Sequence, residues 1–160
     1  MNHSHEEIEE ILEKYSDMVY RVAFSYTRHI ETAEDVCQNV FLKYIEYNKE
    51  FESEEHRKAW LIKVALNECK RVYRSAYYRH TVPLEDIYEA KQEPEDTLFI
   101  EIMKLPLKYR KVLHLFYYEE YSAKEIGDIL GIRENSVTSQ LTRARKKLKK
   151  ILEDGGFEYV

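Results

Sequence analysis

The sequence predicts an all-α protein made of two small helical domains joined by an acidic linker. Apolar residues recur at steps of three and four through most of the 160 residues, the spacing that forms one face of a helix. The chain has only four Gly and three Pro, so long tracts can remain helical. Between 81 and 96 the pattern stops, and two prolines and six acids stand among few large apolar residues. We therefore expect domains over 1–80 and 97–154, a linker over 81–96 and a tail over 155–160.

Three helices are expected in the first domain. An apolar stripe over 8–26 predicts the first, and Thr32, followed by Asp35 three positions later, could cap the second. The segment 48–55 is polar and acidic and is expected to be a loop. A long third helix is expected to follow over 56–78, with its apolar positions facing the other two.

The second domain has the helix start and stop signals of a helix-turn-helix. A short helix is expected before Pro106, which suits the first turn of the next helix. Ser122 with Glu125 forms a capping box, and Gly131 stands where a left-handed residue would end that helix. Another helix should begin near Glu134, and a short helix, a tight turn and a second helix with a polar outer face are typical of a DNA-reading motif.

Charge is segregated along the chain, although the total is only −5. The net charge is −9 over 1–55, +6 over 56–80, −5 over 81–96 and +5 over 134–150. Two basic blocks among acidic ones indicate either nucleic-acid contact at two places or ordinary solvated helix faces. Charge alone leaves both interpretations open.

The remaining bulk features argue against several protein classes. Apolar runs stay short of the roughly 20 residues of a membrane span, and the acidic first ten residues lack the parts of a signal peptide. Cys37 and Cys69 have no metal-like spacing and favour a reducing compartment. We expect a cytoplasmic protein with no membrane insertion, no metal site and no cofactor.

The second basic block predicts a surface that reads duplex DNA. With Val137 and Leu141 buried, short polar side chains, an amide and a guanidinium face outward, which suits close approach and base-edge contacts in a major groove. The basic side chains behind them suit phosphates: Arg145, Lys146, Lys147, Lys149 and Lys150. The predicted duplex-binding residues are Ser136, Thr138, Ser139, Gln140, Thr142, Arg143 and Lys146.

The first basic block is of another kind, because aromatic and basic residues share one side of the expected helix. Rings stack on unpaired bases while Lys and Arg follow the backbone, so the stripe favours a single strand. For Trp60 alone, a place in the core is equally open. The predicted single-strand residues are Trp60, Lys63, Asn67, Lys70, Arg71, Arg74, Tyr77 and Tyr78.

The second helix presents Leu42 on an outer face that is otherwise polar. From the residues alone, this leucine marks a docking surface or is one of the many exposed apolar residues that need no explanation. Its outward neighbours are Asp35, Gln38, Asn39 and Glu46.

Several segments together resemble the extracytoplasmic-function branch of the sigma-70 family over nearly the whole chain. They are Ala33–Val36 with Gln38 and 40–42, then 58–62 through 64–67, then Leu105–Pro106, Tyr121–Ser122, 130–132 and Arg143–Arg145. No single stretch is decisive, but their order around an acidic linker is specific.

The resemblance implies a sigma factor that binds core RNA polymerase and promoter DNA, not an enzyme. It implies that Asp35, Gln38, Asn39, Phe41 and Leu42 meet the clamp helices of the largest polymerase subunit. It also implies that Asn67 engages a −10 base of the non-template strand, that the second domain binds the −35 element and the flap region, and that the linker runs through the polymerase. An anti-sigma factor is an expected partner.

The sequence departs from the family pattern at a few positions. Gly127 stands where alanine is usual, Asn135 where glycine is usual and Thr138 where lysine is common. The loop over 48–55 is also unusually acidic for one expected near an extruded −10 base. These departures bear on promoter sequence more than on fold.

Three other functions compete with this interpretation. A stand-alone helix-turn-helix regulator is the strongest, and it predicts duplex binding without polymerase. A metal-dependent nuclease would need ligands such as Glu34 and Asp35, but adjacent helical residues point in different directions. A pure scaffold would leave both basic faces unexplained.

Overall fold

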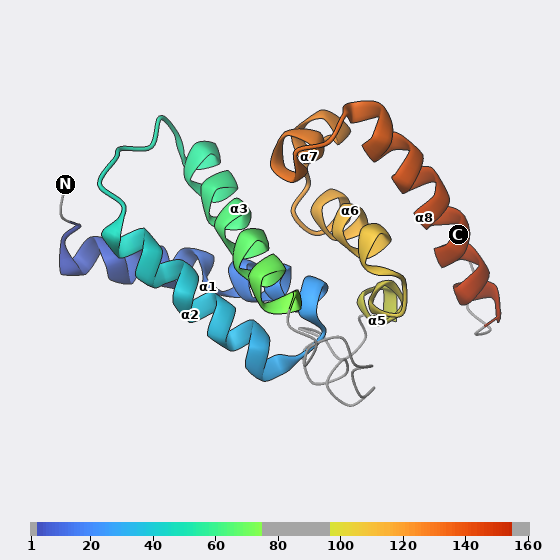
Figure 1. Cartoon of the computed structure of the whole chain (residues 1–160), viewed down its shortest axis with the longest axis horizontal. Coiled ribbons are helices and arrows are strands. Elements are labelled where there is room, and N and C mark those ends of the chain that lie inside the picture. The colour runs from blue at the N-terminus through green and yellow to red at the C-terminus, as the bar shows by residue number, and fades with distance from the viewer. Residues whose placement is uncertain (1–2, 75–96, 155–160) are drawn as a thin grey trace. The chain divides into compact units, whose positions relative to one another are not determined.

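The computed structural model describes residues 3–74 and 97–154, and this part of the chain contains helices and no strand (Figure 1). The chain divides into two units, Met1–Val82 and Pro83–Val160. An all-α fold with two small helical domains is therefore confirmed. The predicted linker over 81–96 and tail over 155–160 lie outside the described residues, so these boundaries stay predictions.

Within residues 3–74 of unit 1, three helices all contact one another: α1 (His5–Thr27), α2 (Ile30–Glu46) and α3 (Glu54–Tyr73). Ser4 caps α1 in a full capping box with Glu7, which satisfies backbone N–H groups that the helix leaves unpaired. The three apolar faces meet in a core that includes Val19, Val40 and Leu61, each with no exposed surface.

Two helix starts in unit 1 differ from the prediction. Thr32 is not a cap: α2 begins at Ile30, and the His29 ring accepts the Thr32 N–H at Nδ1 over 3.2 Å. Thr32 instead lies buried inside the bundle. The third helix begins at Glu54 rather than 56, because the Ser53 hydroxyl accepts the His56 N–H and caps it.

Unit 2 contains α5 (Thr97–Met103), α6 (Leu107–Tyr117), α7 (Ala123–Leu130) and α8 (Glu134–Asp154). Pro106 precedes α6 as its N-cap instead of occupying its first turn. The capping box of Ser122 with Glu125 is confirmed, and Gly131 has the expected left-handed conformation with φ of 72°. Helix α8 packs against α5, α6 and α7, so it contacts each of the other helices described in unit 2.

The core of unit 2 contains a polar group that the sequence pattern did not reveal. His114 Nε2 and a Glu119 carboxylate oxygen lie 3.0 Å apart, and both side chains are almost completely buried. The Arg110 guanidinium, also buried, donates to the Leu105 carbonyl over 2.8 Å. These contacts fix both ends of α6 to the turns that flank it.

The described residues form neither a membrane-spanning helix nor a metal-binding cluster. No helix in 3–74 or 97–154 combines the length and apolar character needed to cross a bilayer. Over the same ranges, no group of three His, Cys, Asp or Glu side chains could hold a metal ion.

Candidate nucleic-acid and protein-binding surfaces

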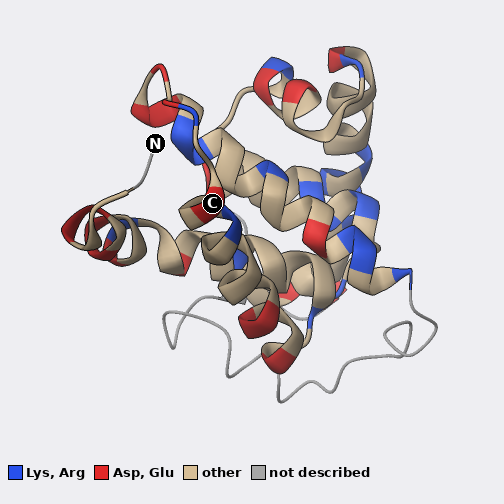
Figure 2. Cartoon of the chain, turned by 60° about the vertical axis from the view of Figure 1, so that its left-hand side comes forward, with Lys and Arg blue, Asp and Glu red and all other residues tan. Residues whose placement is uncertain are grey.

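Lys and Arg residues, blue in Figure 2, recur along α3. Most of the residues predicted to bind a single strand are exposed. Lys63, Asn67, Lys70 and Arg74 are all solvent-accessible on one side of the helix. Tyr77 and Tyr78 lie outside the described residues. Helix α3 thus presents a row of cations around a central amide, here called the α3 stripe: Trp60, Lys63, Asn67, Lys70, Arg71 and Arg74.

Trp60 belongs partly to the core and partly to the surface. Its ring centroid lies 4.7 Å from that of Tyr47 and 5.7 Å from that of Phe51, and Tyr44 approaches it edge-on at 6.0 Å. The side chain nevertheless retains intermediate exposure. Trp60 therefore belongs to the aromatic cluster, and its exposed part lies at the end of the α3 stripe, so its stacking on an unpaired base stays a prediction.

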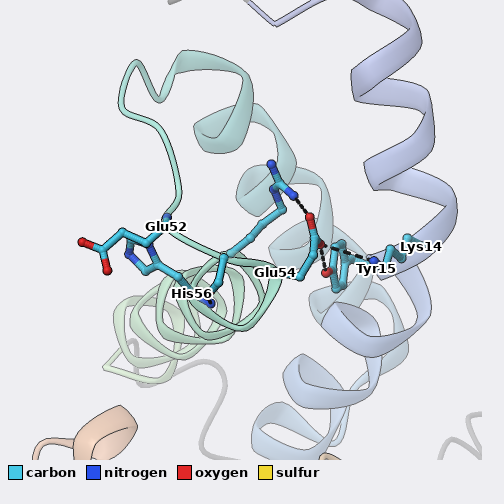
Figure 3. Close-up of polar contacts among 7 residues, drawn as sticks. Lys14, Tyr15, Glu52, Glu54 and His56 are labelled. Carbon is cyan, nitrogen blue, oxygen red and sulfur yellow. Dashed lines mark hydrogen bonds and ion pairs between the residues drawn. The ribbon is translucent and has the colours of Figure 1, made fainter.

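The first turn of α3 is tied to α1 through one carboxylate (Figure 3). Glu54 accepts hydrogen bonds from the Tyr15 hydroxyl over 2.6 Å and from Lys14 Nζ over 3.3 Å, and it pairs with Arg57. The bond from Tyr15 is the main reason that the pKa of Glu54 lies below its usual value. This contact fixes the end of the acidic loop that precedes α3.

A hydrogen bond joins the end of the acidic loop to the first turn of α3. The Glu52 backbone N–H donates to His56 Nδ1 over 3.0 Å, and the His56 ring packs edge-on against Phe51 at 5.2 Å. In Figure 3 the Glu52 carboxylate points away from this contact. The acidic side chain is therefore presented at the surface beside an aromatic cluster.

A second carboxylate joins α3 to α2. Glu68 is 5 % exposed, and it pairs with Lys43 Nζ at 2.5 Å and with Arg71 Nη2 at 2.9 Å. Burial raises the pKa of the Glu68 carboxyl, but the hydrogen bonds from Lys43 and Arg71 outweigh that effect and hold the pKa below its usual value. Glu68 is therefore a buried anion with a cation from each helix.

Helices α1 and α2 form a mostly apolar groove of about 480 Å³, whose lining also includes Asp17 and Glu34. Leu42 is 53 % exposed there, Ile45 is 43 % exposed and Leu12 is 36 % exposed, which is unusual for large aliphatic side chains so close together. The groove residues are Leu12, Ser16, Asp17, Tyr20, Glu34, Cys37, Gln38, Phe41, Leu42 and Ile45.

The predicted docking residues divide between two hollows. Gln38, Phe41 and Leu42 line the α1/α2 groove, where Phe41 is buried. Asn39 instead lines a second hollow, together with Leu42 and the Glu68 ion pairs. Asp35 is exposed on α2 but lines neither.

Sequence reasoning missed the α1 side of the groove, because Leu12 and Tyr20 come from another helix. Ile45 lies three positions after Leu42, and that spacing could have revealed it as a second exposed apolar residue. Cys37 also lines the groove, and burial together with the nearby Asp17 raises its pKa to about 11, so the thiol stays protonated.

Helix α8 presents the predicted polar face. Val137 and Leu141 are buried, as expected, while Ser136, Ser139 and Arg143 are exposed. Thr138, Thr142 and Lys146 are also exposed, and Gln140 is half-buried.

The two threonines of this face use their hydroxyl protons within the helix. Thr138 donates to the Glu134 carbonyl over 3.1 Å, and Thr142 donates to the Thr138 carbonyl over 3.0 Å. Both residues are exposed and their oxygens can still accept hydrogen bonds, so the pair suits base amino groups or a thymine methyl.

Arg145, one turn further along α8, is exposed but packs against α6. Its guanidinium lies 4.9 Å from the Phe116 ring centroid, and Nε donates to the Tyr117 hydroxyl over 3.0 Å. The sequence placed Arg145 among side chains that suit phosphates, whereas here it packs on aromatic rings of α6 and helps to hold α8 in place.

Close backbone packing explains the glycine at 127. A Cβ built at this position would lie 2.7 Å from the Ile132 carbonyl oxygen, and the Ile132 N–H donates to the Gly127 carbonyl over 3.0 Å. The turn that follows α7 thus folds back onto Gly127. An alanine side chain would need this backbone to move.

Comparison with known protein families matches both units. A model of sigma-70 region 2 matches residues 11–79, and a model of sigma-70 region 4 matches residues 101–148. The ECF RNA polymerase sigma factor SigM of Bacillus subtilis is 32 % identical, over 92 % of this chain and 96 % of its own. The ECF sigma factor SigW of the same organism is 29 % identical, over 91 % and 88 %.

Two solved structures share the fold. One is the sigma factor RpoE of Bartonella quintana in complex with the anti-sigma factor NepR, with a TM-score of 0.71 and 20 % identity over 91 % of this chain and 96 % of that one. The other is CnrH in complex with the cytosolic domain of CnrY, with a TM-score of 0.70 and 22 % identity over 94 % and 90 %.

Proposed function

This chain belongs to the extracytoplasmic-function branch of the sigma-70 family, and from that membership we propose how its surfaces divide the work of promoter recognition. As a sigma factor it is not an enzyme; it binds core RNA polymerase and directs transcription initiation at promoters. A regulator that acts on duplex DNA alone is not favoured, because the matches extend over unit 1 as well as over the helix-turn-helix.

The α3 stripe is assigned to the melted −10 element. Its exposed cations can follow the phosphates of one strand, and Asn67 lies among them, where an amide can hydrogen-bond a base edge. Trp60, with Tyr77 and Tyr78, would supply stacking worth roughly 1–3 kcal/mol per base. The bond network of Glu54 supports this role, because it holds the start of α3 against α1.

The polar face of α8 is assigned to the −35 duplex. Ser136, Ser139 and Arg143 are exposed on a helix whose opposite side is buried, and the tight turn at Gly131 leads into it. Arg143 is the side chain best suited to paired hydrogen bonds with a guanine. Thr138, Gln140, Thr142 and Lys146 complete the face.

The α1/α2 groove is assigned to core polymerase, and its occupant is a helix of the clamp. An exposed aliphatic row suits the apolar face of an amphipathic helix, and Asp17 and Glu34 at the groove favour basic residues flanking it. Asp35, Asn39 and Glu46 would extend the contact beyond the groove. The flap region would bind unit 2, and the 81–96 linker would run through the polymerase.

We further assign this chain to the cytoplasm, where core polymerase is found, and expect an anti-sigma factor to control it. The solved complexes of RpoE with NepR and of CnrH with CnrY are the reason for that expectation. An anti-sigma factor that covered the α1/α2 groove would compete directly with the clamp.

The presence of an exposed α3 stripe and a polar α8 face in one chain carries the whole proposal. It is tested by transcription in vitro with core polymerase and a random promoter library. The expected result is initiation at defined positions, with two enriched sequence blocks upstream. Initiation without the −35 block would refute the role of α8, and failure to associate with core polymerase would refute the assignment of the groove.

A further inference from the structure

Glu68 is the sole acidic residue between 56 and 80, and it is buried. One carboxylate oxygen pairs with Lys43 Nζ of α2 at 2.5 Å. The other accepts from Arg71 Nη2 at 2.9 Å and from Arg71 Nε at 3.3 Å. A buried carboxylate is tolerated when cations and hydrogen bonds compensate it, and this one has both.

The two cations belong to different surfaces. Lys43 lies beside Leu42 on α2, next to the groove assigned to polymerase, and its side chain is 55 % exposed. Arg71 lies on the α3 stripe one turn after Asn67, and its side chain is 64 % exposed. Asn39, Leu42 and Glu68 line one hollow together with these cations, so the carboxylate stands at the border of both surfaces.

We propose that Glu68 is a positioning residue, which fixes the Arg71 guanidinium to receive a phosphate of the melted strand. This inference rests on the proposed function of the α3 stripe. Glu68 occupies Nε and one N–H of Nη2, so Nη1 and the second N–H of Nη2 remain as donors on a side chain that is 64 % exposed. The long Arg side chain is thus ordered before the strand arrives, and less rotamer entropy is lost on binding.

Simple electrostatics makes the opposite prediction. Replacing Glu68 by Gln makes the stripe one charge more positive, and a phosphate-binding surface with an added positive charge should bind single-stranded DNA more tightly. A positioning role predicts a loss instead. The sign of the effect therefore separates the two explanations.

The test uses the full chain with core polymerase and compares Glu68→Gln with Glu10→Gln. Glu10 is an exposed acid of α1 outside the α3 stripe and both hollows, so it controls for the change in total charge. We expect Glu68→Gln to slow open-complex formation on a duplex promoter by roughly 2- to 10-fold, the equivalent of ordering one flexible side chain. Opening rates are measured at saturating core polymerase, so that a change in core affinity does not enter them.

The Arg71→Ala background separates a positioning role of Glu68 from a merely structural one. If Glu68 acts through Arg71, the effect of Glu68→Gln disappears in the Arg71→Ala background. A loss that persists there, or a Glu68→Gln variant that opens promoters as fast as Glu10→Gln or faster, overturns the proposal.

A conservative variant covers the case in which Glu68→Gln fails to fold. Arg71→Lys keeps the charge but lacks the forked donors, and it should show the same 2- to 10-fold loss with Glu68 intact. Full activity of Arg71→Lys would contradict the proposal.

A wild-type chain that starts no RNA synthesis with core polymerase refutes the proposed function. Wild-type initiation with indifferent Glu68→Gln and Arg71→Lys variants refutes this inference alone.

Discussion

The groove between α1 and α2 makes the sharpest quantitative prediction, through the double substitution Leu42→Ala with Ile45→Ala. The two side chains are 53 % and 43 % exposed, so together they offer a partner about as much surface as one whole aliphatic side chain. Burying that surface is worth about 1.5–3 kcal/mol at most. We therefore expect the double variant to bind core polymerase about 10- to 150-fold more weakly.

The affinity is measured by equilibrium titration of the labelled chain with core polymerase, with Glu10→Ala as control. Glu10 is an exposed residue of α1 outside both hollows. Thermal unfolding of the double variant should resemble that of the wild type more than that of Leu61→Ala, since removing a fully buried leucine costs about 2–5 kcal/mol. A well-folded double variant that keeps wild-type affinity would refute the docking assignment.

Four further outcomes are expected. Gly127→Ala gains about 1 kcal/mol of helix propensity but forces the Ile132 carbonyl to move, which costs roughly 1–3 kcal/mol. Amide hydrogen exchange in unit 2 should therefore become faster, and slower exchange would show that the turn can move at little cost. Arg143→Ala should weaken transcription from promoters that depend on the −35 element by about 5- to 150-fold, and leave others unchanged. Asn67→Ala should impair opening of duplex promoters more than use of pre-melted ones, and equal losses would exclude a role in opening. Glu54→Gln should lower stability to denaturant at pH 7. The difference in stability from the wild type should shrink as the pH falls through the lowered folded-state pKa of Glu54, because the carboxylate is then protonated in both folded and unfolded chains. A difference that stays constant with pH would mean that the charge of Glu54 is unimportant.

Features that depend on neighbours in sequence could be predicted from the sequence. The capping box of Ser122 with Glu125 and the left-handed Gly131 involve residues within one or two turns of each other, and both were found where expected. The buried positions Val137 and Leu141 follow from helical periodicity in the same way. The polar face of α8 could be predicted because its buried side fixes which residues point outward.

Features that depend on residues distant in sequence could not be predicted in this way. Glu54 pairs with a lysine 40 positions earlier, and Glu68 pairs with a lysine of another helix. On the sequence Glu68 is only an acid within a basic block. Cap chemistry also escaped prediction at the start of α2, because a His ring replaced the expected threonine hydroxyl.

The two carboxylates of α3 act on geometry as well as on stability. Lys14 and Glu54 are both more than half exposed, and an ion pair of that kind contributes only about 0–1 kcal/mol. Glu68 is buried, so replacing it costs more. Glu54 nevertheless fixes the start of α3 to α1, and Glu68 fixes its second half to α2, so both helices that form the groove hold the helix that carries the stripe. Promoter opening by Glu68→Gln should therefore remain slow even at a temperature at which the variant is fully folded, because the substitution frees the Arg71 guanidinium to change direction.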